Sequence, residues 1–161
     1  MERNIGMEVE GRKSFAFLTK ALRDFYFTGN VALIRSEIRL DTEGTSFDVT
    51  NAERPLQGQS PYMLNLQLEY DNPDSGTMIA LLFNEYGRRI TSAGATGQAD
   101  QYEEPYRQVD LVCSQKLGAG FKLKMKGQNL MNYVRRETKD GQEVTSMRKG
   151  INLGFAISWS Y

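Results

Sequence analysis

The sequence contains no histidine and only one cysteine, Cys113. Histidine is the commonest general base and the commonest metal ligand in proteins, so its absence removes both. A single cysteine cannot form an internal disulfide or a paired-cysteine metal or redox site. The carboxylates are scattered, and no nucleophile–base constellation or phosphate-binding glycine loop is present. We therefore predict a protein that is not an enzyme, with no catalytic residue, no cofactor and no metal.

The sequence also has no excess of charge of either sign and no long hydrophobic run. The 20 basic and 20 acidic residues balance, so no basic surface points to nucleic acid. No run approaches the roughly 18 apolar residues that a transmembrane helix needs. The mean hydropathy is negative, but a transmembrane strand needs only every second residue to be apolar. The pattern of apolar residues, and not their average, therefore has to decide between fold classes.

The strongest pattern is an alternation of apolar and polar residues close to the C-terminus. From 151 to 161 every odd position is bulky and apolar, and every even position is small or polar. A period of two is typical of a strand with one apolar and one polar face. The same alternation recurs over 62–70 and 121–127, and near the start in Ile5, Met7 and Val9.

Two segments are β-rich but ambiguous. Over 25–40 the apolar residues change parity after Leu33, which predicts either a bulge or a long strand that leaves the membrane. Over 77–90 both parities are apolar, so we predict a strand without assigning its faces.

Seven strands are predicted in total, over 4–17, 25–40, 61–71, 77–91, 106–117, 121–137 and 146–161. The connections alternate in length. Short ones lie near 18–24, 72–76 and 118–120, and longer ones lie near 41–60, 92–105 and 138–145. Short turns on one side and long loops on the other are typical of a bacterial outer-membrane barrel, whose turns are periplasmic and whose loops are extracellular.

Aromatic residues favour the membrane over a soluble sheet, which also alternates but turns its apolar face inward. They gather near the predicted strand ends, as they do at membrane interfaces. One predicted band holds Phe15, Phe17, Phe25, Phe27, Tyr70, Phe121, Trp159 and Tyr161, and the other holds Tyr62, Tyr86 and Tyr106. We therefore predict that the row containing Leu64, Leu123 and Phe155 faces lipid and that the opposite row faces water.

Four segments resemble, in chain order, the C-terminal part of TonB-dependent outer-membrane receptors. Residues 54–65 resemble a loop-to-strand entry, and residues 83–90 resemble the outgoing strand. The Asn-Leu-Met-Asn of 129–132 is similar to the family's Asn-Leu-Phe-Asp element. Residues 148–161 resemble the last strand, with Tyr161 where the family more often has Phe. Each motif alone is weak, and their order and spacing carry the resemblance.

The resemblance implies an all-β, antiparallel, up-and-down transmembrane segment of about seven strands, an incomplete part of a 22-stranded barrel. Such receptors take up ferric siderophores, cobalamin or oligosaccharides, driven by a TonB complex that acts ahead of a plug domain. Residues 1–161 would be the C-terminal portion of the barrel without the plug, located in the outer membrane and not transport-competent alone. Because the start lacks a signal-peptide layout, we also expect that Met1 is not the natural start.

Two groups of residues are predicted to carry roles. Ile157, Trp159 and Tyr161 look like the family's signal for the barrel-assembly machinery. A basic stripe is formed by Lys122, Lys124 and Lys126. It would face the lumen and attract anionic cargo or pair with carboxylates of the plug. The alternative is that these lysines are ordinary polar residues of a lumen or a surface, without a specific role.

Three other features have bland interpretations. An acidic loop at Asp100 and 102–105 suggests a ligand or cation contact, but we favour a solvated loop. Asp71, Asn72 and Asp74 suggest calcium, but a Pro/Gly turn accounts for them better, because no twelve-residue ligand loop is present. Cys113 has the parity of the apolar row and is predicted to be a small lipid-facing hydrophobe.

Two rival hypotheses stay open. A stand-alone small outer-membrane barrel or adhesin-like protein would need an eighth strand, because seven transmembrane strands leave open edges that lipid does not tolerate. A soluble β-barrel carrier of an apolar ligand would turn the apolar parity inward and would stay soluble without detergent.

Overall fold

The computed structural model describes residues 2–40 and 50–160, and antiparallel strands make up most of this part of the chain. The elements are β1 (Glu2–Ser14), η1 (Phe15–Phe17), η2 (Lys20–Leu22), β2 (Phe25–Arg39), β3 (Glu53–Arg54), β4 (Tyr62–Asn72), β5 (Thr77–Tyr86), β6 (Arg89–Ser92), β7 (Gln101–Glu103), β8 (Tyr106–Gly118), β9 (Phe121–Gln128), β10 (Val134–Lys139), β11 (Gln142–Arg148) and β12 (Asn152–Trp159). In this part of the chain no helix is long and apolar enough to cross a membrane.

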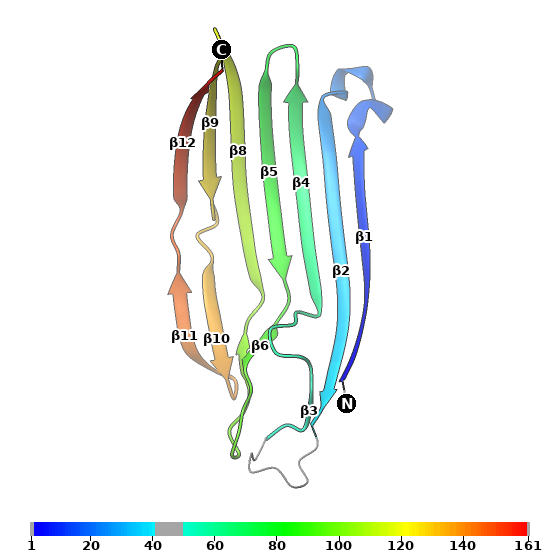
Figure 1. The fold of residues 1–161 in the computed structure, drawn as a ribbon, viewed down its shortest axis with the longest axis vertical. Helices are drawn as coiled ribbons and strands as arrows, with labels where there is room; N and C mark the ends of the chain where they lie inside the picture. Colours follow the sequence, from blue (N-terminus) through cyan, green and yellow to red (C-terminus); the bar gives the residue numbers. More distant parts are fainter. Residues whose placement is uncertain (1, 41–49, 161) are drawn as a thin grey trace.

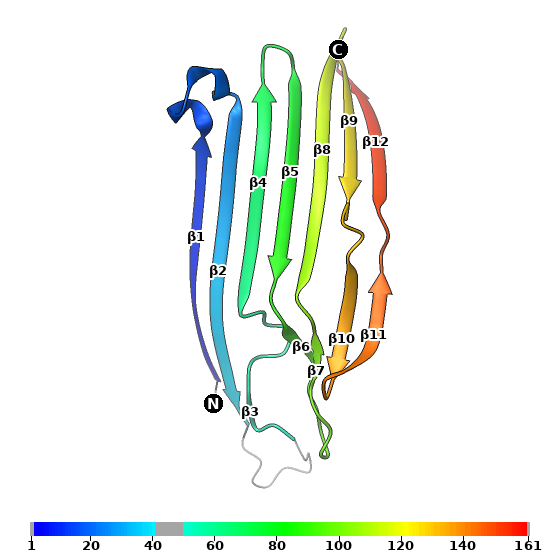
Figure 2. The same ribbon diagram turned by 180° about the vertical axis from the view of Figure 1, so that it is seen from behind.

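The main sheet is an up-and-down meander with the order β1-β2-β4-β5-β8-β9-β12 and with β3 beside β2. Figures 1 and 2 show its long strands side by side. A second sheet, β11-β10-β7-β6, continues the main sheet at one end, since β6 follows β5, β7 precedes β8, β10 follows β9 and β11 precedes β12. The predicted all-β, antiparallel fold with seven long strands is therefore confirmed. Three of the predicted strands, over 77–91, 121–137 and 146–161, are each interrupted into a pair.

The connections differ between the two ends of the main sheet. At one end, which we call the turn end, lie η1 with η2, the four residues between β4 and β5, and the two between β8 and β9. At the other end, the loop end, lie the long link between β2 and β4 and the second sheet. Asn72 shapes one of the short turns, because its side-chain oxygen accepts from the Ser75 backbone N–H at 2.8 Å. The Pro/Gly turn predicted there is therefore confirmed.

One predicted loop is wrong. Residues 138–145 form a tight hairpin, in which Asp140 and Gly141 alone connect β10 and β11. Both residues have positive φ, 51° and 75°, as a two-residue type I′ turn requires, and Asp-Gly is a favoured pair for it.

Strand β2 resolves the ambiguous segment over 25–40. It pairs with β1 from Tyr26 to Ile38 without a register shift. The bulge alternative is therefore wrong, and a single long strand is correct. Past Leu33 the apolar parity changes because other segments lie against the other face, where Ile34 lines a small cavity with Pro55 and Ile90. The Ile34 backbone N–H also donates to the Pro61 carbonyl at 2.9 Å, from the link that precedes β4.

The sheet is open within the described residues. Strands β1 and β12 form its two edges and do not pair with each other. The buried apolar side chains of the described residues are few and scattered: Ala32, Ala80, Ile90 and Tyr106. A self-contained soluble domain of this size would bury a much larger contiguous core.

The hairpin at Asp140 and Gly141 gives a first prediction. Gly141→Ala forces a Cβ into a left-handed conformation and should lower the free energy of unfolding by about 1–2 kcal/mol. The control is Gly11→Ala, because Gly11 lies in an extended strand and an added Cβ there meets no atom within 4 Å. Urea unfolding in detergent, followed by circular dichroism, measures both. Equal effects of the two substitutions would contradict the type I′ assignment.

Candidate functional site

One face of the main sheet is apolar from edge to edge, and we call it the apolar face. The strand registers align its side chains in rows that cross the sheet. One row runs through Phe27, Leu68, Leu81, Leu111, Gly127 and Leu153, and the next runs through Phe25, Tyr70, Ile79, Cys113, Met125 and Phe155. Leu64 and Leu123 lie on the same face. The shared face predicted for Leu64, Leu123 and Phe155 is therefore confirmed, as is the apolar parity of Cys113.

The apolar face is uncovered in the described part of the chain. Leu153, Phe155 and Ile157 on β12 are 70–73% exposed, and Leu81 in the middle of the sheet is 44% exposed. Full burial of one such side chain is worth roughly 1.5–3 kcal/mol. A continuous apolar surface of this extent therefore indicates contact with a partner or with lipid.

The opposite face, the polar face, carries amides and charges in register. One row runs through Glu10, Asn30, Asn65, Asn84 and Gln108. Side chains bond to one another within the row and to the next row, with Asn65 donating to Asn30 at 3.3 Å and Gln108 donating to Asp110 at 2.9 Å. Small residues on this face are shielded, since Ala80 is only 5% exposed. The more shielded face is thus the polar one, the reverse of a soluble sheet packed on a core.

The two predicted groups of functional residues lie on opposite faces. Lys122, Lys124 and Lys126 share the polar face, where they pair in register with Lys116, Ser114 and Val112. Ile157 and Trp159 lie on the apolar face, paired with Leu123 and Phe121. The Trp159 indole N–H donates to the Ala119 carbonyl at 3.2 Å, which ties the end of β12 to the turn before β9. Tyr161 lies outside the described residues. The roles of both groups stay predictions.

The second aromatic band is only partly where the sequence pattern placed it. Tyr62 lies on the apolar face, opposite Leu33. Tyr86 and Tyr106 instead pair with each other on the polar face, with ring centroids 5.6 Å apart. All three tyrosines lie at the loop end, as predicted, but only Tyr62 shares a face with Leu64, because the even positions of β5 and β8 belong to the polar face. At the turn end, the Phe25 ring contacts the Tyr70 ring at a tilt, and Phe121 stacks on Trp159; all four lie on the apolar face.

A buried carboxylate, Glu103, connects three strands at the loop end. Its side chain is fully buried. It accepts from the Tyr86 hydroxyl at 2.7 Å and from Arg89 Nε at 2.8 Å, and it forms an ion pair with Arg135 of β10. Burial alone would raise the pKa of Glu103 above its ordinary value of 4.5, but these donors and positive charges outweigh burial and lower the pKa. The carboxylate is therefore held ionised.

Asp100 forms a second buried centre beside the link between β2 and β4. It accepts from the Gly94 backbone N–H at 2.7 Å and from Asn51 at 2.8 Å, and Arg54 lies 3.5 Å from it. The prediction of a solvated acidic loop at Asp100 and Glu103 was therefore wrong, because both carboxylates are buried and paired with arginines. A cation or ligand contact has no support either, since no cluster of three metal-ligating side chains exists among the described residues.

The Asn-Leu-Met-Asn segment over 129–132 forms the break between β9 and β10. Asn129 and Asn132 both have positive φ, 55° and 47°, which asparagine tolerates better than most residues. Asn129 is buried. Its side-chain amide donates to the Gly150 carbonyl at 2.8 Å, and its backbone N–H donates to the Asp110 carboxylate at 2.9 Å. The segment thus ties the break between β9 and β10 to β8 and to the link before β12.

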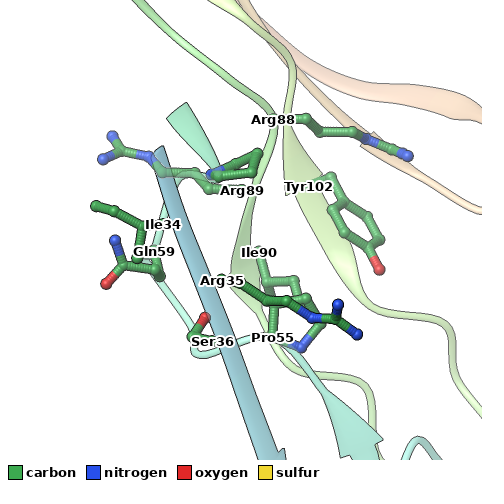
Figure 3. A pocket seen from close by; sticks show the side chains of 10 residues that line it. Ile34, Arg35, Ser36, Pro55, Gln59, Arg88, Arg89, Ile90 and Tyr102 are labelled. Atoms are coloured by element: carbon green, nitrogen blue, oxygen red, sulfur yellow. The ribbon is translucent and has the colours of Figure 1, made fainter. Parts of the chain in front are cut away.

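A small cavity of about 170 Å³ lies at the loop end, between β2, the link before β4, β6 and β7. Figure 3 shows the side chains around it, among them Ile34, Pro55, Ile90 and Tyr102. Arg88 lies over the Tyr102 ring, 4.0 Å from its centroid, and pairs with Glu104 at 3.1 Å. The cavity is small, and two of its three arginines, Arg88 and Arg89, are already paired with Glu104 and Glu103. We therefore interpret it as imperfect packing between elements and not as a ligand site.

Comparison with known proteins gives no relatives: no protein-family model, no curated protein and no solved structure matches this chain.

The Glu103 centre gives a second prediction. Sequence reasoning missed it, because Arg89 and Arg135 lie far apart in the chain and neither has a local signal. Glu103→Gln leaves two arginines without their shared carboxylate and should lower the free energy of unfolding by about 1–3 kcal/mol. Glu143→Gln is the matched control, since its ion pair with Arg136 is exposed and such pairs contribute about 0–1 kcal/mol. Urea unfolding in detergent compares them, and an effect of Glu103→Gln no larger than that of the control would refute the role of this centre.

Proposed function

We propose that the chain is the C-terminal barrel portion of a TonB-dependent outer-membrane receptor, which takes up a scarce nutrient of the ferric siderophore, cobalamin or oligosaccharide class. The observation that carries the proposal is the uncovered apolar face, continuous across all seven long strands and backed by a hydrogen-bonded polar face. Lipid covers a face of this kind in a transmembrane barrel, whose interior is polar.

Strand length supports the same proposal. The apolar face on β4 runs from Tyr62 to Tyr70 and on β2 from Phe25 to Leu33. Each stretch matches the roughly 9–11 residues with which a tilted strand crosses a bilayer. The exposed edges of β1 and β12 are where the remaining strands of a 22-stranded barrel would pair, because lipid does not tolerate an unpaired edge. The turn end would then face the periplasm and the loop end the outside.

In this proposal the predicted residue groups take the roles that the resemblance implies. The barrel-assembly machinery would recognise Ile157, Trp159 and Tyr161 when the last strand enters the membrane. Lys122, Lys124 and Lys126 would line the lumen beside the plug domain. The TonB complex would act on the region that carries the plug, which these residues do not include.

The lipid contact gives a third prediction. Leu81 and Leu82 are adjacent, and only Leu81 lies on the apolar face, while Leu82 pairs with Gln67 and Asp110 on the polar face. Leu81→Arg should oppose membrane insertion by about 2–4 kcal/mol near the bilayer centre. Leu82→Arg is the matched control and should insert normally. Insertion is measured as the fraction of full-length protein that reaches the outer-membrane fraction with a folded, heat-modifiable mobility.

The result separates the rival proposals. Equal loss of insertion for both variants, or loss for Leu82→Arg alone, would contradict a lipid-facing Leu81. A soluble carrier would instead stay soluble and monomeric without detergent, with a cooperative melting transition.

The transport activity gives a fourth prediction. Deletion of the gene should abolish growth when one nutrient of the proposed class is limiting, in a panel of ferric siderophores, cobalamin and oligosaccharides. Deletion of the TonB complex in the parent strain should abolish growth on that same nutrient, because uptake draws its energy from that complex. Full growth on every nutrient, or uptake that persists without TonB, would favour a stand-alone barrel or adhesin.

A further inference from the structure

Two arginines lie on the apolar face where β1 and β2 approach the loop end. Arg35 is paired in register with Ile5, and Arg3 is paired with Glu37. The two arginines are therefore diagonal neighbours on one face, with Cα atoms about 7–8 Å apart. Both are exposed. Together with Ile5 and Glu37 they line a hollow of about 220 Å³.

Neither arginine has a hydrogen bond or an ion pair within residues 2–40 and 50–160. Other arginines at this end of the apolar face do have carboxylate partners: Arg39 lies 2.9 Å from Glu37, and Arg107 lies 3.1 Å from Glu85. Because Glu37 is already paired with Arg39, it does not neutralise Arg3. Among the described residues, the hollow therefore carries an excess of positive charge at the loop end of the apolar face.

The position of the pair along the strands fits the edge of a membrane. Arg35 lies two residues beyond Leu33, where the apolar stretch of β2 ends, and Arg3 lies two residues beyond Ile5. Two residues of a strand span about 6–7 Å. If the apolar face meets hydrocarbon, as in the proposed function on which this step rests, the two guanidinium groups lie at the depth of the lipid headgroups.

We propose that Arg3 and Arg35 bind the phosphate of an anionic lipid in the leaflet at the loop end. The planar guanidinium fork matches phosphate oxygens in a bidentate geometry. An acyl chain of the same lipid lies along Ile5, Met7 and Leu33, which are 50–62% exposed beside the hollow. The site thus recognises both parts of the lipid, its charged head and its apolar tail.

The test compares two lipids that differ only in phosphate. The full chain in dodecylmaltoside micelles is titrated with dioleoyl phosphatidic acid or with dioleoylglycerol, and retained lipid is counted by native mass spectrometry. Arg3→Gln/Arg35→Gln should weaken binding of phosphatidic acid by about 25-fold, at about five-fold per arginine, and should leave dioleoylglycerol unchanged. The control Arg12→Gln/Arg136→Gln removes the same charge elsewhere and should change neither lipid by more than about two-fold.

The remaining outcomes overturn one proposal or the other. If the unchanged chain retains neither lipid, lipid contact by the apolar face fails, and the proposed function fails with it. If the unchanged chain and Arg3→Gln/Arg35→Gln both retain phosphatidic acid and dioleoylglycerol to the same extent, the phosphate site is refuted and the proposed function stands. If Arg12→Gln/Arg136→Gln weakens binding of phosphatidic acid equally, the effect comes from the total charge of the protein, and the phosphate site is refuted. Displacement of phosphatidic acid by an equimolar amount of inorganic phosphate would identify a free-phosphate site instead of a lipid site.

Discussion

Antiparallel pairing in a fixed register is the constraint on which the rest of the structure depends. Because side chains alternate along a strand, a slip of one residue would move every apolar side chain of that strand to the polar face. The registers of all seven long strands agree, so that Phe27, Leu81 and Leu153 fall in one row across the sheet. Two chemically opposite faces follow from this agreement, and the proposed membrane role and lipid site both follow from the faces.

The sequence predicted the strands wherever one parity was purely polar, as over 121–127 and 151–161. It could not decide which face each side chain of β5 lies on, because Met78 and Leu82 are as apolar as Ile79 and Leu81. Only the register with β4 and β8 decides which of them share a face with Leu68 and Leu111. The misplacement of Tyr86 has the same cause. The hairpin at 140–141 did carry a local signal, since Asp-Gly between polar strands is a turn pair.

The loop end was beyond sequence reasoning for a different reason. Glu103, Arg89 and Arg135 come together through three separate strands, and each looks like an ordinary surface charge in its own segment. A buried carboxylate there needs its partners in place, because an unpaired charge is costly to bury. Such centres join the second sheet to the main one, because Glu103 accepts from Tyr86 of β5 and Asp100 lies beside Arg54 of β3.

The environment of Cys113 tests the central claim most directly. It is the only cysteine and lies on the apolar face in the row of Tyr70 and Ile79, while Ser114 beside it lies on the polar face. A nitroxide attached to Cys113 of the full-length protein in bilayers should collide with dissolved oxygen more than with a water-soluble nickel chelate. A label at position 114, in Cys113→Ser/Ser114→Cys, should show the reverse preference. Greater accessibility of Cys113 to the nickel chelate, or shielding of Cys113 from both reagents, would contradict a lipid-facing apolar row.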